Sequence, residues 1–208
     1  MEGLLVTGGD APKRERLASR FRDFALVCAA DSGLDILRAW DLEPDIIVGD
    51  MDSVSDASLL GSYPRAAIAV SPRDKDETDT ELGLAALRER GATRITLAGG
   101  GGGRLDHLLA IRAIFERRLR PAEWHTALEA VFLVEEGSLF MGSASPGGTV
   151  SVFPLGSGAD GMASEGLAWP LAALRWGPGD FGVSNIAVGG DFAVRAGRGD
   201  LLVVVARP

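Results

Sequence analysis

The chain has 208 residues, enough to bury a sizeable core in one large domain or two modest ones. With 46% hydrophobic and 24% charged residues it has the composition of an ordinary globular protein, which excludes the disordered and collagen-like classes. Its net charge of −8, without an arginine-rich stripe interleaved with aromatics, argues against a nucleic-acid partner. An acidic protein that binds a polyphosphate needs local neutralisation of charge, which a divalent metal supplies.

The cysteine content and the hydropathy of the sequence indicate the cellular compartment of the protein. The single cysteine, Cys28, lies in an apolar run, so we expect a buried, unreactive thiol and no disulfide framework. The N-terminus lacks a basic region with a long apolar core, and no stretch of about 18 apolar residues occurs. We therefore expect a cytoplasmic protein that does not bind a membrane.

Short β-branched runs alternate with amphipathic segments over the first two-thirds of the sequence. Buried strands are predicted at residues 4–8, 25–30, 45–49, 66–70, 94–99 and 130–134. Helices are predicted at residues 13–23, 33–40, 80–90 and 105–119. The alternation predicts an α/β fold with an N-terminal Rossmann-like domain, residues 1–135, whose mostly parallel sheet carries helices on both faces.

The pattern changes after about residue 136, where short β-prone pieces are separated by Gly, Pro and Asp. It predicts a smaller C-terminal antiparallel β domain over residues 136–208. Two runs in this region, 156–161 and 177–182, match G-x-G-x-x-G. Neither lies in a βαβ unit, so both are predicted to be turns.

Three acidic or glycine-rich motifs follow predicted strands of the first domain: Gly49–Ser53 (GDMDS), Asp74–Asp79 (DKDETD) and Gly99–His107 (GGGGGRLDH). Ligands of open α/β sheets bind beyond the carboxyl ends of the strands. The three motifs are therefore expected to contribute to one ligand site.

The first motif places Asp50 and Asp52 two residues apart, so that both carboxylates of an extended chain point the same way. Hard oxygen ligands favour Mg²⁺, usually shared with substrate phosphates. The alternative is a solvated turn that Ser53 caps.

The second motif has four acids within six residues, interrupted by Lys75. Such a run is often only the acidic start of a helix. Thr78 and Glu81 have the spacing of a capping box, and Gly91 offers a C-terminal stop. Lys75 is one of two lysines in the chain, and its compact ammonium suits a place near phosphate.

The third motif has five consecutive glycines, Gly99–Gly103, before Arg104 at a predicted helix start. Glycine is costly in conformational entropy, so five together need a reason. Bare amides at a helix N-terminus form an anion site, to which an arginine adds a bidentate phosphate contact. The alternative is a flexible surface loop.

Several common sites are excluded. No Gly-Lys pair and no G-x-S-x-G sequence occurs, which excludes P-loop kinases and α/β-hydrolases. The two histidines, His107 and His125, cannot form a zinc site with one buried cysteine.

Five motifs in order, at residues 29–33, 49–53, 74–87, 99–107 and 166–185, resemble the thiamine pyrophosphokinase family over nearly the whole chain. The resemblance implies transfer of the β,γ-pyrophosphoryl group from ATP to the hydroxyethyl oxygen of thiamine, giving thiamine diphosphate and AMP. It also implies Mg²⁺, a thiamine-binding C-terminal β-sandwich, and a homodimer with active sites at the subunit interface.

The resemblance also implies roles for single residues. Mg²⁺ would be bound by Asp50, Asp52 and Asp79. The nucleotide would be held by Asp31, Ser32, Gly33, Asp74, Lys75, Asp76, Thr78, Gly101, Gly102, Gly103 and Arg104. The catalytic set would be Asp50, Asp52, Asp79, Arg104 and Asp106, with Asp79 or Asp106 as the proton acceptor and Asp106 orienting Arg104 or the reacting groups.

In the β domain, Trp169 would stack on the thiamine rings, in the partner subunit's site, while Ser184 and Asn185 would hydrogen-bond the pyrimidine. The chain departs from the family pattern at two positions. Met51 replaces the usual Phe between the metal aspartates, a soft hydrophobic exchange. Ala168 replaces the usual Lys before the aromatic residue, which removes a cation from the thiamine site and puts substrate affinity in question.

Two alternative functions stay open. The N-terminal motifs serve the nucleotide, so the acceptor is alternatively another alcohol such as a hydroxymethylpterin, which an aromatic side chain also stacks on. The other alternative is a non-catalytic thiamine or nucleotide sensor on the same fold.

Overall fold

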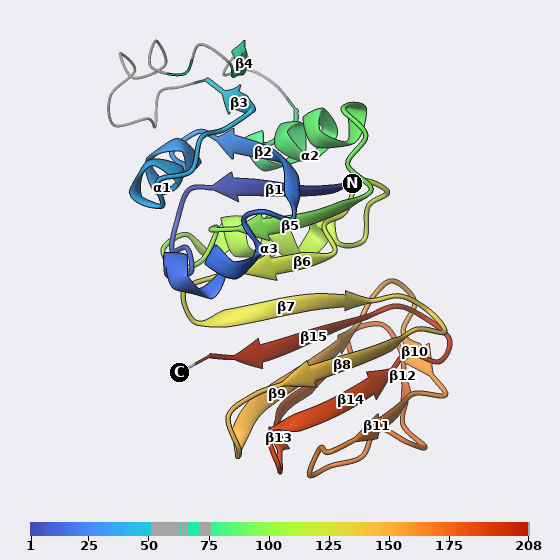
Figure 1. Ribbon diagram of the computed structural model, residues 1–208. Helices are drawn as coiled ribbons and strands as arrows, with labels where there is room; N and C mark the ends of the chain where they lie inside the picture. The colour runs from blue at the N-terminus through green and yellow to red at the C-terminus, as the bar shows by residue number, and fades with distance from the viewer. Residues whose placement is uncertain (51–62, 64–65, 71–75, 208) are drawn as a thin grey trace. The chain divides into compact units, whose positions relative to one another are not determined.

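The computed structural model describes residues 1–50, 63, 66–70 and 76–207 (Figure 1). The chain forms two compact units, Met1–Ala127 and Leu128–Pro208. The boundary lies before the predicted one at 135/136, because β7 (Glu129–Val134) pairs antiparallel with β15 (Leu201–Ala206) of the second unit. The strand predicted at 130–134 is therefore present, but it belongs to the β domain.

The first unit contains a parallel sheet. Its strands are β1 (Glu2–Thr7), β2 (Phe24–Ala30), β3 (Ile46–Gly49), β4 (Ala67–Val70), β5 (Arg94–Ala98) and β6 (Glu123–His125). They lie in the order β6-β5-β1-β2-β3-β4, and each neighbouring pair is parallel. The sequence predicted the first five of these strands and missed β6, whose Glu-Trp-His sequence has no β-branched run.

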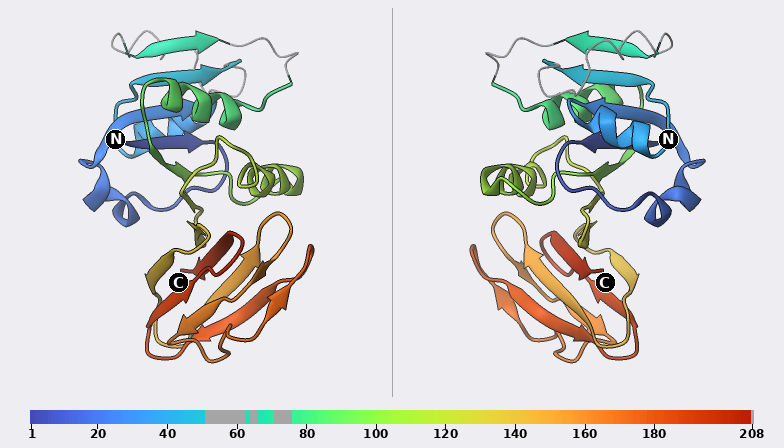
Figure 2. Two further views of the ribbon diagram at one scale, coloured as in Figure 1. Left: turned by 90° about the vertical axis from the view of Figure 1, so that its right-hand side faces the viewer. Right: turned by 90° about the vertical axis from the view of Figure 1, so that its left-hand side faces the viewer.

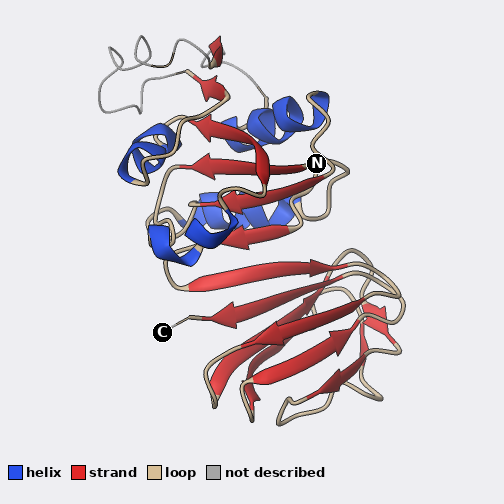
Figure 3. Ribbon diagram, viewed as in Figure 1, coloured by secondary structure: helices blue, strands red, loops and turns tan. Residues whose placement is uncertain are grey.

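Three helices flank this sheet: α1 (Gly33–Ala39), α2 (Asp79–Glu89) and α3 (Leu105–Ile114). On one face, Leu34 and Leu37 of α1 share an apolar core with Leu4 and Val6 of β1. On the other face, Gly83 lets α2 approach closely, because a Cβ there would lie 2.4 Å from Leu5 Cδ1. Figures 2 and 3 show helical segments on both sides of the sheet, as predicted.

Helix α2 begins at the predicted capping box. The Thr78 hydroxyl accepts a hydrogen bond from the Glu81 amide at 3.3 Å, and Glu81 Oε2 accepts one from the Thr78 amide at 3.0 Å. After the helix, Gly91 adopts a φ of +91°. Both end signals are confirmed.

The helix predicted at 13–23 is wrong, because this segment forms two short 3₁₀ turns, Arg14–Arg16 and Ala18–Arg20. No side chain caps either turn, and one arginine from each turn makes a tertiary contact. Arg14 Nε donates to the Trp40 carbonyl at 2.6 Å, and Arg20 Nη1 donates to Glu123 at 2.6 Å. Tertiary contacts thus override helix propensity here. Helix α3 also ends earlier than predicted, at Ile114.

The second unit is a β-sandwich, as the predicted fold class requires. One antiparallel sheet has the order β13 (Gly182–Ala187), β9 (Gly148–Pro154), β15, β7. The other has the order β11 (Ala163–Glu165), β14 (Asp191–Arg195), β8 (Leu139–Ser143). A small ladder joins β10 (Ala159–Asp160) to β12 (Arg175–Trp176).

Side chains from both sheets form the core of this unit, among them Val152, Val203, Phe192 and Val194. In β9, buried residues alternate with partly buried ones, a pattern that is typical of such packing. No helix in the described part of the chain is long and apolar enough to cross a membrane.

Cys28 is fully buried in β2, and burial raises the pKa of its thiol to about 12. The thiolate is therefore absent at neutral pH, as expected for an unreactive core cysteine.

A buried carboxylate is the centre of an ion-pair network at the N-terminal ends of β1, β5 and β6. Glu123, whose side chain is 7% exposed, accepts hydrogen bonds from Arg20 at 2.6 Å and Arg94 at 2.5 Å. The His125 ring nitrogen lies 3.0 Å from the same carboxylate, and Glu2 also contacts both arginines. Burial opposes ionisation, but the hydrogen bonds from His125, Arg94 and Arg20 outweigh it and hold the pKa of Glu123 well below its usual value.

Replacement of Glu123 by Gln should lower the free energy of unfolding at pH 7 by roughly 2–3 kcal/mol, because it leaves two arginines beside an uncharged group. A lowered folded-state pKa stabilises the protein above the unfolded value of about 4.3, and this contribution is lost at lower pH. Urea unfolding should therefore show a gap between wild type and variant that narrows from pH 7 to about pH 3.5.

The matched control is Glu116→Gln, which removes an exposed partner of Arg112 and should change stability little. A wild-type to Glu123→Gln gap of the same size at both pH values would contradict this interpretation.

Candidate functional site

A cleft of about 490 Å³ lies in the first unit at the carboxyl ends of β1, β2 and β5. It is the location expected for a ligand in an open α/β sheet. The residues that line it are Thr7, Gly8, Gly9, Asp10, Asp31, Ser32, Thr78, Asp79, Thr80, Gly100, Gly101, Gly102, Gly103, Arg104, His107, Ala110, Ile111 and Ile114.

Much of the predicted nucleotide site meets in this cleft. The predicted residues that line it are Asp31, Ser32, Thr78, Asp79, Gly101, Gly102, Gly103 and Arg104. Gly33 does not line it and has a packing role, since a Cβ there would lie 2.0 Å from the Val6 carbonyl oxygen. Asp50 and Asp76 are described but are not among the lining residues, while Asp52, Asp74 and Lys75 lie outside the described residues.

Backbone hydrogen bonds hold the first half of the glycine loop. The Gly99 amide donates to His125 O at 3.0 Å, and the Gly100 amide donates to Gly8 O at 2.6 Å. The Asp10 amide donates to Gly101 O at 2.7 Å. The loop after β5 is thus joined to the loop after β1, in contrast to the alternative of a flexible surface loop.

The second half of the loop is open. Within the part of the chain that the structure describes, the amides of Gly102 and Gly103 have no hydrogen-bond acceptor. A Cβ added to Gly103 would meet nothing within 4 Å. Since both residues line the cleft directly before α3, these amides are placed as donors for an anion at a helix N-terminus.

Arg104 occupies the N-cap position of α3 without capping it. Its Nε and Nη2 donate to the two carboxylate oxygens of Asp106 at 3.1 and 2.5 Å. This hydrogen-bonded pair raises the pKa of Arg104 and lowers the pKa of Asp106. Asp106 therefore orients the guanidinium at the cleft without lining the cleft itself.

Asp31 has a strained backbone, with a φ of +47° directly after β2. Its amide donates to Val48 O at 3.0 Å, and its carboxylate lies against Gly49, where a Cβ would be 1.8 Å from Oδ1. Such strain often occurs at functional sites. It brings the Asp31 carboxylate beside the segment that ends in Asp50.

Sequence reasoning missed several lining residues. The run Gly8–Asp10 lies at the carboxyl end of the first predicted strand, so the rule that located the other motifs would also have found it. Thr80 contacts Thr7 through its hydroxyl, with the two oxygens 3.2 Å apart. The apolar wall of Ala110, Ile111 and Ile114 on α3 has no sequence signal that separates it from ordinary core.

In the second unit, the three predicted acceptor-binding residues lie together. Asn185 is 7% exposed, and its side-chain amide donates to Trp169 O at 2.7 Å and accepts from the Trp169 amide at 3.1 Å. It also accepts from the Ile186 amide at 2.8 Å. The Trp169 side chain itself is 59% exposed. Most of the hydrogen-bonding capacity of Asn185 therefore holds the backbone that carries this indole.

Ser184 lies in an irregular part of β13, where the register with β9 shifts between Gly182 and Asn185. Its φ is +60°, and its amide donates to Ser151 Oγ at 3.1 Å. A bulge at an edge strand re-aims side chains. Here it separates an exposed Val183 from the buried Asn185.

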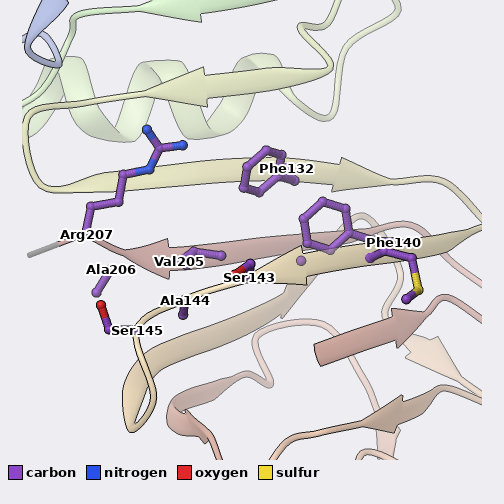
Figure 4. A pocket seen from close by; sticks show the side chains of 10 residues that line it. Phe132, Phe140, Ser143, Ala144, Ser145, Val205, Ala206 and Arg207 are labelled. Carbon is purple, nitrogen blue, oxygen red and sulfur yellow. The ribbon is translucent and has the colours of Figure 1, made fainter. Parts of the chain in front are cut away.

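A second cavity, of about 340 Å³, lies in the second unit among β7, β8 and β15 (Figure 4). The Phe132 and Phe140 rings, with centroids 4.6 Å apart, form part of its lining, and Arg207 lies at another part. None of the predicted site residues lines it.

The two ends of the glycine loop should differ in their tolerance of a side chain. Gly99 has a φ of +98° and no room, since a Cβ would lie 2.0 Å from Thr7 O. Gly99→Ala should lower the free energy of unfolding by at least about 2–3 kcal/mol, whereas Gly103→Ala should lower it by about 1 kcal/mol, through its backbone conformation alone. Urea unfolding of both variants tests this order, and equal losses would contradict it.

Loss of the Asn185 side chain should release the Trp169 segment. Asn185→Ala leaves buried backbone groups unsatisfied and should cost about 2–3 kcal/mol of unfolding free energy. Amide hydrogen exchange of a peptide covering residues 165–172 should also accelerate. The matched variant Asn185→Asp keeps the acceptor oxygen but sets a second carboxylate oxygen against Trp169 O, so it should cost at least as much as Asn185→Ala. Unchanged exchange in both variants would show that this contact does not order the segment.

The family model described as thiamin pyrophosphokinase, catalytic domain, matches residues 17–120, half of the chain. A search of the curated proteins finds no significant match.

Among solved structures, a thiamin pyrophosphokinase family protein from Enterococcus faecalis aligns with a TM-score of 0.83 and 22% identity over 100% of both chains. Thiamine pyrophosphokinase from Bacillus subtilis aligns with a TM-score of 0.83 and 19% identity, also over 100% of both chains. Thiamin pyrophosphokinase from Geobacillus thermodenitrificans aligns with a TM-score of 0.80 and 23% identity over 100% of this chain and 98% of that one. These structures share the fold, and the family match identifies this chain as a member of the thiamine pyrophosphokinase family.

Proposed function

We propose that this protein transfers the β,γ-pyrophosphoryl group of ATP to the hydroxyethyl oxygen of thiamine, giving thiamine diphosphate and AMP. The observation that carries the proposal is the open end of the glycine loop, with Gly102, Gly103 and Arg104 at the start of α3, in a domain that matches the family's catalytic model. Amides at a helix N-terminus and a guanidinium are suitable ligands for a polyphosphate.

The cleft also fits Mg²⁺ in the chemistry of its oxygen donors. Asp10, Asp31 and Asp79 line it, and carboxylates shared with substrate phosphates are typical magnesium ligands. Within the described ranges no three such side chains form a complete metal-binding group. We propose that Asp79, with Asp50 and Asp52 of the first motif, holds the ion, which would neutralise charge on the reacting phosphates.

The reaction needs positioning and charge neutralisation more than covalent help. In the proposed step the thiamine hydroxyl oxygen attacks the β-phosphorus, the bond from that phosphorus to the α,β-bridging oxygen breaks, and AMP leaves. The hydroxyl proton passes to a carboxylate. Of the two candidate proton acceptors, Asp79 lines the cleft while Asp106 is bound to Arg104, so we propose that the Asp79 oxygen that does not hold the ion accepts the proton.

For the acceptor, we propose that the exposed indole of Trp169 stacks on the thiamine rings, with Ser184 beside it. Asn185 would act mainly by holding Trp169. We further propose a cytoplasmic homodimer in which each active site includes residues of both subunits.

The direct test is AMP formation from ATP and Mg²⁺ with thiamine, with a hydroxymethylpterin and with no acceptor. We expect AMP and thiamine diphosphate in equal amounts, with thiamine only. AMP formed only with the pterin would show that the acceptor is a pterin alcohol and not thiamine. No AMP with either compound would contradict the enzymatic function and favour a sensor.

Arg104→Ala should lower kcat/KM by about 10²–10³, because it removes a cation aimed at charge that develops during transfer. The matched control is Arg112→Ala on the same helix, where the arginine pairs with Glu116 and does not line the cleft. Its kcat/KM should stay within about twofold of wild type. Equal losses in both variants would remove Arg104 from the proposed phosphate site.

A further inference from the structure

The short strand β6 lies beside the start of the glycine loop and holds Gly99 from two sides. The Gly99 amide donates to the His125 carbonyl at 3.0 Å. The Gly99 carbonyl accepts a hydrogen bond from the indole nitrogen of Trp124 at 2.7 Å, in a buried contact. Trp124 belongs to none of the motifs that carry the proposed chemistry, and it does not line the cleft.

We propose that Trp124 is a positioning residue for the glycine loop and thereby sets the affinity of the cleft for the nucleotide. The inference rests on the proposed function, since it takes the loop to hold the ATP phosphates. It adds a residue outside the cleft that acts on the ligand through the backbone.

Trp124 contacts the peptide unit between Gly99 and Gly100. Trp124 holds its carbonyl, and Gly8 O accepts from its amide nitrogen at 2.6 Å. Neither residue has a Cβ to restrict rotation of this unit, and both have positive φ, +98° and +69°. The orientation of the peptide plane therefore depends on these two hydrogen bonds.

Packing fixes the position of Trp124 itself. Its main chain pairs with Leu97 of β5, the strand that leads into the loop. Its side chain is 8% exposed, and a Cβ added to Gly100 would lie 3.6 Å from the indole nitrogen and 2.3 Å from Ile111 of α3. The indole is thus packed against the loop, and Ile111 leaves no room for a side chain at Gly100.

The indole N–H of Trp124 supplies a donor to the Gly99 carbonyl that a phenyl ring of similar size lacks. An indole nitrogen donates and does not accept, so it pairs with a carbonyl in one way. A phenyl ring would fill most of the same volume and leave the buried Gly99 carbonyl without this donor. An unpaired buried carbonyl is unfavourable, so the Gly99 carbonyl would rotate toward another hydrogen-bond donor. Because it shares a planar peptide unit with the Gly100 amide, this rotation would turn that amide away from Gly8.

The consequence would reach the open end of the loop. Gly102 and Gly103 follow the fixed turn directly, and their amides are the proposed phosphate donors. If the turn is less well ordered in the free protein, the nucleotide must order the loop when it binds. The entropy lost in this ordering lowers the affinity for the nucleotide. The effect should fall on nucleotide binding and spare the acceptor.

The test compares wild type with Trp124→Phe in the binding of α,β-methylene-ATP with Mg²⁺, an analogue whose α,β bridge cannot be cleaved, by calorimetry. We expect about tenfold weaker binding, the worth of one buried hydrogen bond. In turnover, the KM for ATP should rise similarly while the KM for thiamine stays unchanged. The matched control is Trp40→Phe, which changes another buried indole of the same unit that is stacked on Phe21 and does not line the cleft. It should bind as wild type does.

Binding by Trp124→Phe that equals wild type would overturn this inference and leave the proposed function standing. Binding that is weakened equally in both variants would also overturn it, because the loss would then reflect general destabilisation. Failure of wild type to bind the analogue would overturn the proposed function and this inference with it.

A measurement on the wild-type protein covers the case in which Trp124→Phe does not fold. The four indole N–H resonances can be assigned by elimination from Phe replacements of Trp40, Trp169 and Trp176. The Trp124 proton should exchange slowly with solvent and shift when α,β-methylene-ATP binds. Rapid exchange, or a resonance that does not move at saturation, would overturn the inference.

Discussion

Around the carboxyl end of β1, backbone segments approach each other more closely than any side chain permits. A Cβ at Gly33 would lie 2.0 Å from Val6 O, and one at Gly99 would lie 2.0 Å from Thr7 O. These two contacts bring α1 and the loop after β5 against the same strand. The cleft exists because its walls meet in this way, so the site depends on backbone approach before any side chain acts.

The five consecutive glycines, Gly99–Gly103, lose a large conformational entropy when the loop adopts one conformation. Backbone hydrogen bonds order only the first part of this loop within the described residues. His125, Gly8 and Asp10 hold the first three glycines, while Gly102 and Gly103 line the cleft with amides that have no acceptor within the described residues. A fixed base with an open end suits a site that must be preorganised for a polyphosphate and still accept one.

The proposed acceptor region of the second unit shows a comparable division between buried and exposed groups. Strain at Ser184 and the buried amide of Asn185 set the backbone, and the indole of Trp169 remains exposed. In both units, buried polar contacts define the geometry that exposed groups then present. We take this as the reason why the predicted binding residues differ so much in burial.

Strand and helix periodicity was sufficient to predict the parallel sheet, the capping box at Thr78 and the change to a β domain. It failed where tertiary contacts decide. The segment 13–23 has helical spacing, but its arginines bond to Trp40 O and Glu123, which belong to distant parts of the chain. Likewise, nothing in the pattern around Asn185 indicates that its side chain serves the Trp169 backbone, because that contact arises only when β13 folds beside residue 169.

We propose that the open end of the glycine loop binds the nucleotide phosphates. A crystal structure of the protein with α,β-methylene-ATP and Mg²⁺ tests it most directly. We expect phosphate oxygens within hydrogen-bonding distance of the Gly102 and Gly103 amides, with the ion on carboxylates of the same cleft. Phosphates bound elsewhere, with these amides facing solvent, would contradict it.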